Sequence, residues 1–206
     1  MIQLDNAVKR YKKIILDELY EKNIKCWIGG GAIRDYFMGV PITTDHDIFF
    51  PNEDEFNKCL SYFKDNNCKI VWESDNGVKL KHNDRTFDLV KKYFPDPQSS
   101  INEFDFTVSM FAVDAEKVYY GKTTFIDLAK RQLMINKITY PASTLSRAFR
   151  YHTKGFKICL GEIKKIIEAI QDMPKEEKKS KGVDLNNKDE KETTSAEMID
   201  FFIGID

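Results

Sequence analysis

GGGAIRD at residues 29–35, followed by DHD at residues 45–47, is the stretch that decides the fold of this 206-residue chain. Glycines allow backbone N–H groups to approach a phosphate, and a helix that begins there adds a partial positive charge. Two carboxylates at positions i and i+2 of a strand point to the same face, with Cα atoms roughly 6.6 Å apart. Carboxylates that converge in this way can bind two Mg²⁺ ions about 3.5–4 Å apart. The stretch therefore predicts a triphosphate-binding turn beside a metal-binding strand, which is the equipment for nucleotidyl transfer.

The composition is that of a soluble globular protein, since 42% of the residues are hydrophobic and 32% are charged. A net charge of −1 gives no overall basic field, so any contact with nucleic acid must come from a local patch. The four cysteines lack CxxC or secreted-scaffold spacing, which predicts reduced thiols in a cytoplasmic protein. The first residues do not resemble a signal peptide, and no apolar stretch is long enough to span a membrane.

Composition and periodicity predict four segments along the chain. Residues 1–138 are expected to form the catalytic head domain, and residues 139–173 a helical neck-like segment. The composition shifts to mixed charge after Pro174, so residues 174–194 are predicted to be a flexible linker. Apolar residues at helical spacing return in residues 195–206. They predict a short helix that docks on the body or joins two copies into a homo-oligomer.

Local patterns predict the individual elements of the head and neck. An amphipathic helix is expected at residues 4–22, and Asn52 with Glu55 indicates a capping box for a second helix. Asn-containing turns at residues 76–77 and 83–84 are expected to join three strands. The remaining expectations are helices at 32–38, 52–64 and 126–133 and from Ser143, strands at 25–28, 46–50, 69–72, 78–81, 86–90 and 104–113, and a loop at 95–100.

The glycine turn and the two aspartates together resemble the first motif of a known enzyme family. The matching residues are Gly30, Gly31, Arg34, Asp35, Gly39, Asp45 and Asp47. This pattern resembles the head domain of class II tRNA nucleotidyltransferases and bacterial poly(A) polymerases, of the DNA polymerase beta-like nucleotidyltransferase superfamily. The resemblance covers about residues 23–158 and implies an α+β fold, with a short mixed twisted sheet backed by helices and followed by helical neck segments.

Later parts of the chain carry diluted versions of the family's other motifs. Asp88 lies in a predicted strand where the family has a further acidic residue, and Asp105 begins the sequence DFT of the second motif. Arg147 and Arg150 fall where the neck helices begin. The resemblance implies that two Mg²⁺ ions, with Mn²⁺ as an alternative, are bound by Asp45, Asp47 and Asp88. It implies nucleotide binding by Gly30, Gly31, Arg34, Asp35, Asp105, Arg147 and Arg150.

The chain also departs from the family, first at positions that contact the ribose and triphosphate and then at positions that read the base. Where the family has two arginines before DFT and an Asn after it, this chain has Glu103, Phe104 and Ser109. Where the neck has Glu-Asp-x-x-Arg, this chain has Tyr140, Pro141 and Thr144. The template that selects C or A is therefore missing, which argues against a CCA-adding role. An aromatic ring, with Phe104 as the candidate, is expected to stack on the base instead.

Each candidate residue has a structural alternative. Arg34 reaches the phosphates or braces the turn through Asp35, and Asp88 is a metal ligand or an outward-facing strand residue. Asp105 contacts nucleotide or caps a helix, with a slight preference for the cap. The basic residues form a strip beside the site or solvated faces; they are Lys91, Lys92, Arg147, Arg150, Lys154 and Lys157.

Three functions remain open from the sequence. The favoured one transfers a nucleoside monophosphate from an NTP to an RNA or tRNA 3′ end, with release of pyrophosphate. The second transfers it to a small molecule or a protein. In the third, a degenerate head domain binds nucleotide or RNA without catalysis. The retained Asp45 and Asp47 favour an enzyme, whereas the near-neutral charge weakens a broad RNA contact.

Overall fold

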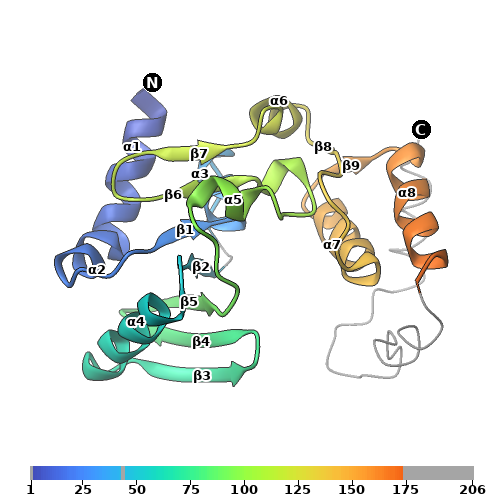
Figure 1. Ribbon diagram of the computed structural model, residues 1–206. Coiled ribbons are helices and arrows are strands. Elements are labelled where there is room, and N and C mark those ends of the chain that lie inside the picture. Colours follow the sequence, from blue (N-terminus) through green and yellow to red (C-terminus); the bar gives the residue numbers. More distant parts are fainter. Residues whose placement is uncertain (1, 43–44, 174–206) are drawn as a thin grey trace.

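The computed structural model describes residues 2–42 and 45–173 and contains one large sheet with helices packed around it (Figure 1). The chain opens with a helix in three parts: α1 (Ile2–Tyr11), the π-helical segment η1 (Lys12–Leu16) and α2 (Asp17–Glu21). Tyr11, Ile15 and Leu19 are buried, so the amphipathic helix predicted at residues 4–22 is confirmed. Its apolar side belongs to the main core.

Seven strands form a mixed sheet in the order β3-β4-β5-β2-β1-β6-β7. They are β1 (Trp27–Gly29), β2 (His46–Phe49), β3 (Lys69–Ser74), β4 (Gly77–His82), β5 (Arg85–Val90), β6 (Phe111–Val113) and β7 (Val118–Tyr120). In this sheet β2 and β5 run parallel, and the other neighbouring strands run antiparallel. The predicted α+β fold with a mixed sheet is confirmed, as is the turn at residues 83–84, whereas the turn predicted at 76–77 lies one residue earlier, at 75–76, because Gly77 is already the first residue of β4.

The two faces of the sheet are covered differently. Ile28, Ile48 and Leu89 point into the main core, which also contains α4 (Glu53–Asp65) through side chains such as Phe63. Successive strand residues alternate between faces, so Trp27 and Phe49 point to the opposite face. There they form a smaller core with Ile101 of the short helix α5 (Pro97–Ile101). This smaller core leaves the β2–β5 part of the second face open for polar side chains.

The helix cap predicted at Asn52 is present, but only half of the capping box forms. The Asn52 side chain accepts a hydrogen bond from the Glu55 N–H at 3.0 Å. The Glu55 carboxylate does not return to Asn52; it accepts from the Lys25 N–H at 2.6 Å and from Lys58 at 2.7 Å. Glu55 therefore ties α4 to the chain just before β1, a long-range contact that a local pattern does not reveal.

Three predicted elements differ from the structure. Residues 95–100 are not a loop, because Asp96 caps α5 by accepting from the Ser99 N–H, with Pro97 at the first helical position. Residues 104–113 are not one strand but a 3₁₀ turn, η2 (Thr107–Ser109), followed by β6. The helix expected at 126–133 is α6 (Thr124–Ala129), and Arg131 with a φ of 54° turns the chain into β8 (Gln132–Leu133).

Two longer helices complete the described chain. They are α7 (Pro141–Thr153) and α8 (Leu160–Gln171), with β9 (Lys157–Ile158) between them pairing parallel to β8. The helices expected from Ser143 are thus present, and they lie beside the sheet in Figure 1. The predicted linker at 174–194 and helix at 195–206 lie outside the described residues. Across the described helices, none combines the length and apolar composition that crossing a membrane requires.

Candidate active site

A row of residues across neighbouring strands builds the candidate site. Asp47 of β2 pairs with Asp88 of β5, and Asp88 pairs with Lys79 of β4. On the other side, Asp47 pairs with Gly29 of β1. Residues paired across strands project to the same face of a sheet. The parallel β2–β5 pairing therefore brings together two carboxylates that are far apart in sequence.

Lys79 bridges two of the three predicted metal ligands. Its ammonium nitrogen lies 2.5 Å from Asp45 Oδ2 and 3.4 Å from Asp88 Oδ2. Each of these three side chains is about one-third exposed, at 34%, 33% and 31%. The hydrogen bond from Lys79 to Asp45 is the main cause of a raised Lys79 pKa. The ammonium group therefore compensates part of the negative charge of the carboxylate cluster.

Asp47 has a strongly perturbed pKa. Burial, together with the charges of Asp88 and Asp45, raises the pKa of Asp47 to about 7. Burial is also the main cause of the raised Asp88 pKa, and Asp88 Oδ1 is buried without a hydrogen-bond partner among the described residues. Carboxylates that repel one another and have an oxygen without a hydrogen-bond partner are suitable ligands for a hard cation such as Mg²⁺.

The carboxylates of Asp45, Asp47 and Asp88 are suitable ligands for a divalent cation, but their positions in this structure do not form a metal site. Within residues 2–42 and 45–173, no group of three or more Asp, Glu, His or Cys side chains is arranged to hold a metal ion. Lys79 stands between two of the candidate ligands. Asp45, Asp47 and Asp88 would hold the metal once the Lys79 ammonium withdraws.

The glycine turn leaves space for the Asp47 side chain, and not all of its N–H groups are free to bind a phosphate. Gly30 has a φ of 80° and a ψ of −137°, a conformation that side chains disfavour. A Cβ at Gly30 would lie 3.3 Å from Asp47 Oδ2. The Gly30 N–H donates to the Phe111 carbonyl at 2.9 Å, so its predicted contact with the triphosphate requires this bond to open and stays a prediction. Gly31, the first residue of α3 (Gly31–Phe37), lines the pocket.

Arg34 and Asp35 form a closed pair beneath the site. Nε and one terminal nitrogen of Arg34 donate to Asp35 Oδ1 at 2.8 and 2.5 Å, and Arg34 is only 2% exposed. The guanidinium carbon lies 4.9 Å from the centre of the Tyr151 ring. Arg34 also lines the pocket, whereas Asp35 does not. The pair fits the structural alternative, in which Asp35 braces Arg34, and the predicted contact of Asp35 with nucleotide stays a prediction.

One face of α7 supplies the opposite wall of the pocket. The residues on it follow the spacing i, i+3, i+4 and i+7: Arg147, Arg150, Tyr151 and Lys154. Burial, followed by the charge of Arg34, lowers the Lys154 pKa. Arg150 and Lys154 have no ion-pair partner in the described part of the chain. This wall offers positive charge to an anionic ligand.

Asp105 connects the head to α7. Its Oδ2 accepts from Arg147 and, at 3.1 Å, from the Thr144 hydroxyl, and it is 9% exposed. Asp105 is not a helix cap, because Phe106 occupies the cap position of η2 without a side-chain bond. Both of these bonds are internal and Asp105 does not line the pocket, and its predicted nucleotide contact stays a prediction. Thr144 occupies the position where the family has its base-reading Arg, and its side chain is buried. This burial agrees with the expectation from the sequence that the template for base selection is missing.

The other family departures also have structural partners. Ser109 contacts the Tyr151 hydroxyl, and Glu103 pairs with Lys137 at 2.6 Å and with Lys92 at 3.5 Å. The Phe104 ring lies above the glycine turn, with its tip 3.3 Å from where a Cβ of Gly29 would stand. Phe104 does not line the pocket, so its stacking on a base stays a prediction.

Sequence reasoning missed Lys79 and Tyr151. A two-residue turn at 83–84 pairs residue 82 with 85, and the same register pairs Lys79 with Asp88, so the hairpin could have revealed Lys79. Tyr151 follows from the helical spacing of the α7 basic residues. The predicted basic strip divides, because Lys91 pairs with Glu73 outside the pocket.

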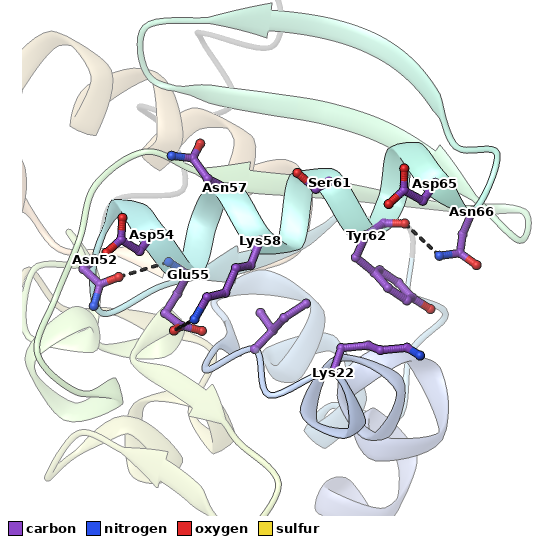
Figure 2. A pocket seen from close by; sticks show the side chains of 11 residues that line it. Lys22, Asn52, Asp54, Glu55, Asn57, Lys58, Ser61, Tyr62, Asp65 and Asn66 are labelled. Carbon is purple, nitrogen blue, oxygen red and sulfur yellow. Dashed lines mark hydrogen bonds and ion pairs between the residues drawn. The ribbon is translucent and has the colours of Figure 1, made fainter.

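Two pockets of the described structure are candidates for the active site, and they differ in the side chains that line them. The pocket between the carboxylates and α7 has a volume of about 340 Å³. A wider groove of about 870 Å³ runs along α4, and Figure 2 shows its polar side chains, several of which bond to one another, such as Glu55 with Lys58. None of the predicted site residues lines that groove. The smaller pocket is therefore the candidate active site.

Comparisons with known proteins identify the family. The family model described as Gabija anti-defense 2 family protein matches residues 3–131. The chain belongs to the Gabija anti-defense 2 family. A curated relative, Gabija anti-defense 2 of Bacillus phage SPbetaL7, is 30% identical over 173 residues, which is 76% of this chain and 40% of the relative. The chain thus spans about two-fifths of the length of that relative.

Solved structures of tRNA-processing enzymes resemble this family member in fold. The Bacillus stearothermophilus CCA-adding enzyme in complex with CTP has a TM-score of 0.56 at 18% identity, covering 70% of this chain and 39% of that one. Another CCA-adding enzyme with CTP gives 0.59 at 16%, covering 82% and 46%. A tRNA nucleotidyltransferase with primer tRNA and an ATP analogue gives 0.55 at 16%, covering 80% and 50%. The likeness confirms a nucleotidyltransferase-like fold, and the family membership corrects the tRNA nucleotidyltransferase assignment.

Proposed function

We propose that this member of the Gabija anti-defense 2 family is a nucleotidyltransferase that moves a nucleoside monophosphate from an NTP to a hydroxyl acceptor. An RNA or tRNA 3′ end is the favoured acceptor. The acceptor oxygen bonds to the α-phosphorus as the bond to the β-phosphate oxygen breaks. Pyrophosphate leaves, and the hydroxyl proton passes to solvent. We further propose that this transfer serves to counter the Gabija defence, as the name of the family and of its phage relative suggests.

One observation carries the proposal: three carboxylates and a cationic helix face line the two sides of one pocket. Asp45, Asp47 and Asp88 would hold the divalent metals, which supply charge neutralisation for the phosphates and a more acidic acceptor hydroxyl. Arg150 and Lys154 have the charge to bind the triphosphate from the α7 side. A ligand that carries both phosphates and Mg²⁺ matches a pocket with opposite charges on opposite walls.

Lys79 has a defined part in this proposal. In the absence of metal its ammonium group holds Asp45 and Asp88 together, at 2.5 and 3.4 Å. Lys79 would have to leave these carboxylates for them to hold a divalent metal. Its flexible stem allows it to leave without disturbing β4.

The missing base-reading pair shapes the specificity that we propose. Thr144 is buried and bonded to Asp105, so it cannot present hydrogen bonds to an incoming base. We therefore propose NTP use without the C-then-A order of CCA addition. Transfer to a small molecule or protein, and binding without catalysis, are the competing functions.

The test is a labelling experiment with Asp47→Asn. Purified protein is incubated with each labelled NTP, Mg²⁺ and total RNA, and the products are separated into RNA, protein and small molecules. Loss of several kcal/mol of metal-borne stabilisation corresponds to about a thousandfold slower incorporation. Asp65→Asn, an exposed aspartate at the end of α4, is the matched control and keeps wild-type activity.

The outcomes separate the three functions. Label on RNA that disappears in Asp47→Asn supports the proposal. Label confined to protein or a small molecule selects the second function. Equal incorporation by Asp47→Asn and the wild type refutes the assignment of this site, and NTP binding without incorporation selects the binding module.

A further inference from the structure

The β3–β4 end of the site face carries an exposed tryptophan. Trp72 on the edge strand β3 is 54% exposed, whereas Trp27, the other tryptophan of the chain, is 4% exposed and bonded to Ser100. The neighbours of Trp72, Ile70 and Val71, are also exposed, at 39% and 55%, and contiguous exposed apolar side chains indicate a surface that binds a partner. The question is what the position of Trp72 fits.

The strand register places Trp72 beside the candidate active site. Trp72 pairs with Lys79, and Lys79 pairs with Asp88. Partners in a ladder project to the same face, so Trp72 shares the face of the carboxylates. Two strand spacings put its Cα roughly 10 Å from that of Asp88. Trp72 thus lies on the Asp88 side of the pocket, opposite the wall formed by α7.

A second row adds positive charge next to the tryptophan. Lys69 pairs with Lys81, and Lys81 pairs with Thr86, all on the same face as Lys79 and Asp88. Lys69 and Lys81 are exposed, and neither has an ion-pair partner among the residues that the structure describes. The acidic residue that the register of β3, β4 and β5 places on this face is Asp88, a candidate metal ligand. The surface therefore presents an aromatic ring with two free ammonium groups.

We propose that the β3–β4 face binds a single-stranded nucleic acid and delivers its terminal hydroxyl to Asp88. A base stacks on Trp72, and phosphates lie near Lys69 and Lys81. Sequence-tolerant strand binding combines aromatic stacking with a positively charged track in this way. The inference rests on the proposed function for the role of the strand as acceptor, and it names the side of the pocket from which that acceptor enters.

The arrangement gives each anionic substrate its own wall. The triphosphate faces Arg150 and Lys154 on α7, and the strand faces Trp72 and the β3–β4 lysines. The carboxylates lie between them. Two polyanions therefore approach the same metal site without sharing cationic side chains, which explains how a chain with a net charge of −1 can bind both.

The first measurement is strand binding by fluorescence anisotropy. Labelled RNA and DNA of about 12 nucleotides, a length within the range of known strand-binding sites, are titrated into the full chain without NTP. Trp72→Ala is expected to weaken binding about tenfold, the cost of one stacked base. Trp72→Phe keeps a ring and stays close to wild type. Ile126→Ala, which removes a side chain of equal exposure on α6, leaves binding unchanged.

Two further readouts report on the same contact. Stacking quenches the emission of Trp72, so RNA is expected to quench wild-type fluorescence and to have little effect on Trp72→Phe. In a salt titration, the double variant Lys69→Gln and Lys81→Gln is expected to lower the slope of log K against log salt by about 1.4. A larger effect with RNA than with DNA identifies RNA as the strand, and the reverse identifies DNA.

The surface and the proposed function fail in different ways. Equal affinity of Trp72→Ala and wild type, or no binding of either oligonucleotide, overturns the inference. Strand binding that depends on Trp72, without incorporation of any labelled NTP, keeps the surface and removes the proposed function. Asp47→Asn binds the strand like wild type if the two parts are independent, and its loss of strand binding would contradict the assignment to β3–β4.

Discussion

Two ionic clusters flank the pocket, and they differ in exposure. In the first, Arg34 and Asp35 have side chains that are 2% and 5% exposed, and the Tyr151 ring covers the guanidinium group. In the second, Lys79 holds Asp45 and Asp88 with about a third of each side chain in contact with solvent. The first cluster is almost entirely buried, although Arg34 lines the pocket, whereas the second is open to ions.

The difference teaches which charges are scaffold and which are exchangeable. A buried pair that loses one partner leaves an uncompensated charge in a medium of low polarity. An exposed pair contributes little to stability and can be replaced by another cation at small cost. The arrangement therefore fixes the turn that carries the glycines and keeps the metal ligands available.

The largest effect is expected from breaking the closed cluster. Arg34→Met leaves the Asp35 carboxylate buried and unpaired, which destabilises the fold by about 3–5 kcal/mol. Urea denaturation measures the loss. Arg150→Met, which removes an arginine without an ion-pair partner among the described residues, is the control and costs less than about 0.5 kcal/mol. Equal stability of the two variants would contradict the closed character of the pair.

The glycine turn should respond next in size. Gly30→Ala forces a side chain into a backbone conformation with φ of 80° and brings its Cβ to 3.3 Å from Asp47 Oδ2. We expect a loss of about 1–3 kcal/mol in stability together with weaker Mn²⁺ binding. Gly39→Ala shares a positive φ but meets nothing within 4 Å. It should lose stability only, and a matching loss of Mn²⁺ binding would remove the link to Asp47.

The open cluster is tested by Lys79→Met. Removing the competing ammonium group is expected to tighten Mn²⁺ binding roughly tenfold and to lower stability without metal by less than about 1 kcal/mol. Electron paramagnetic resonance counts free Mn²⁺, and thermal unfolding follows stability with and without the ion. Lys91→Met removes a partly buried lysine that pairs with Glu73 instead. Unchanged Mn²⁺ affinity in Lys79→Met would show that Lys79 does not compete with metal.

The smallest expected effect comes from Tyr151→Phe. This change keeps the ring over Arg34 and removes only the hydroxyl contact with Ser109, at a cost of about 0.5–1.5 kcal/mol. Tyr151→Ala also uncovers the guanidinium group and should cost more. Chemical denaturation of the two variants compares the contribution of the hydroxyl contact with that of the ring over Arg34. If they unfold alike, the ring does not help to close the first cluster.

The sequence predicted the parts of the site that depend on local pattern. The glycine turn, the aspartates of β2 and the β3–β4–β5 hairpins follow from short-range periodicity and turn residues. Asp88 was placed correctly on its strand because the same hairpin rule applies. Lys79 was within reach of that rule and was overlooked.

The sequence did not predict contacts that join distant segments. The Glu55 carboxylate bonds to the Lys25 N–H rather than to its own cap, and Asp105 bonds to Thr144 of α7 rather than to the turn that follows it. Asp35 is predicted to contact nucleotide, but in the structure its buried carboxylate accepts hydrogen bonds from Arg34. In each case a tertiary contact, which a single sequence does not reveal, overrode a local preference. The α5 helix was missed because Pro97 reads equally well as part of a loop.

The parallel pairing of β2 with β5 has a consequence for how the protein folds. Asp47 and Asp88 are 41 positions apart, and α4 and the β3–β4 hairpin lie between these two strands in the sequence. Contacts of such long range close slowly, because chain entropy is lost before the pairing repays it. A chain in which β2 and β5 have not paired therefore lacks the acidic pair, so the proposed metal binding depends on this long-range contact.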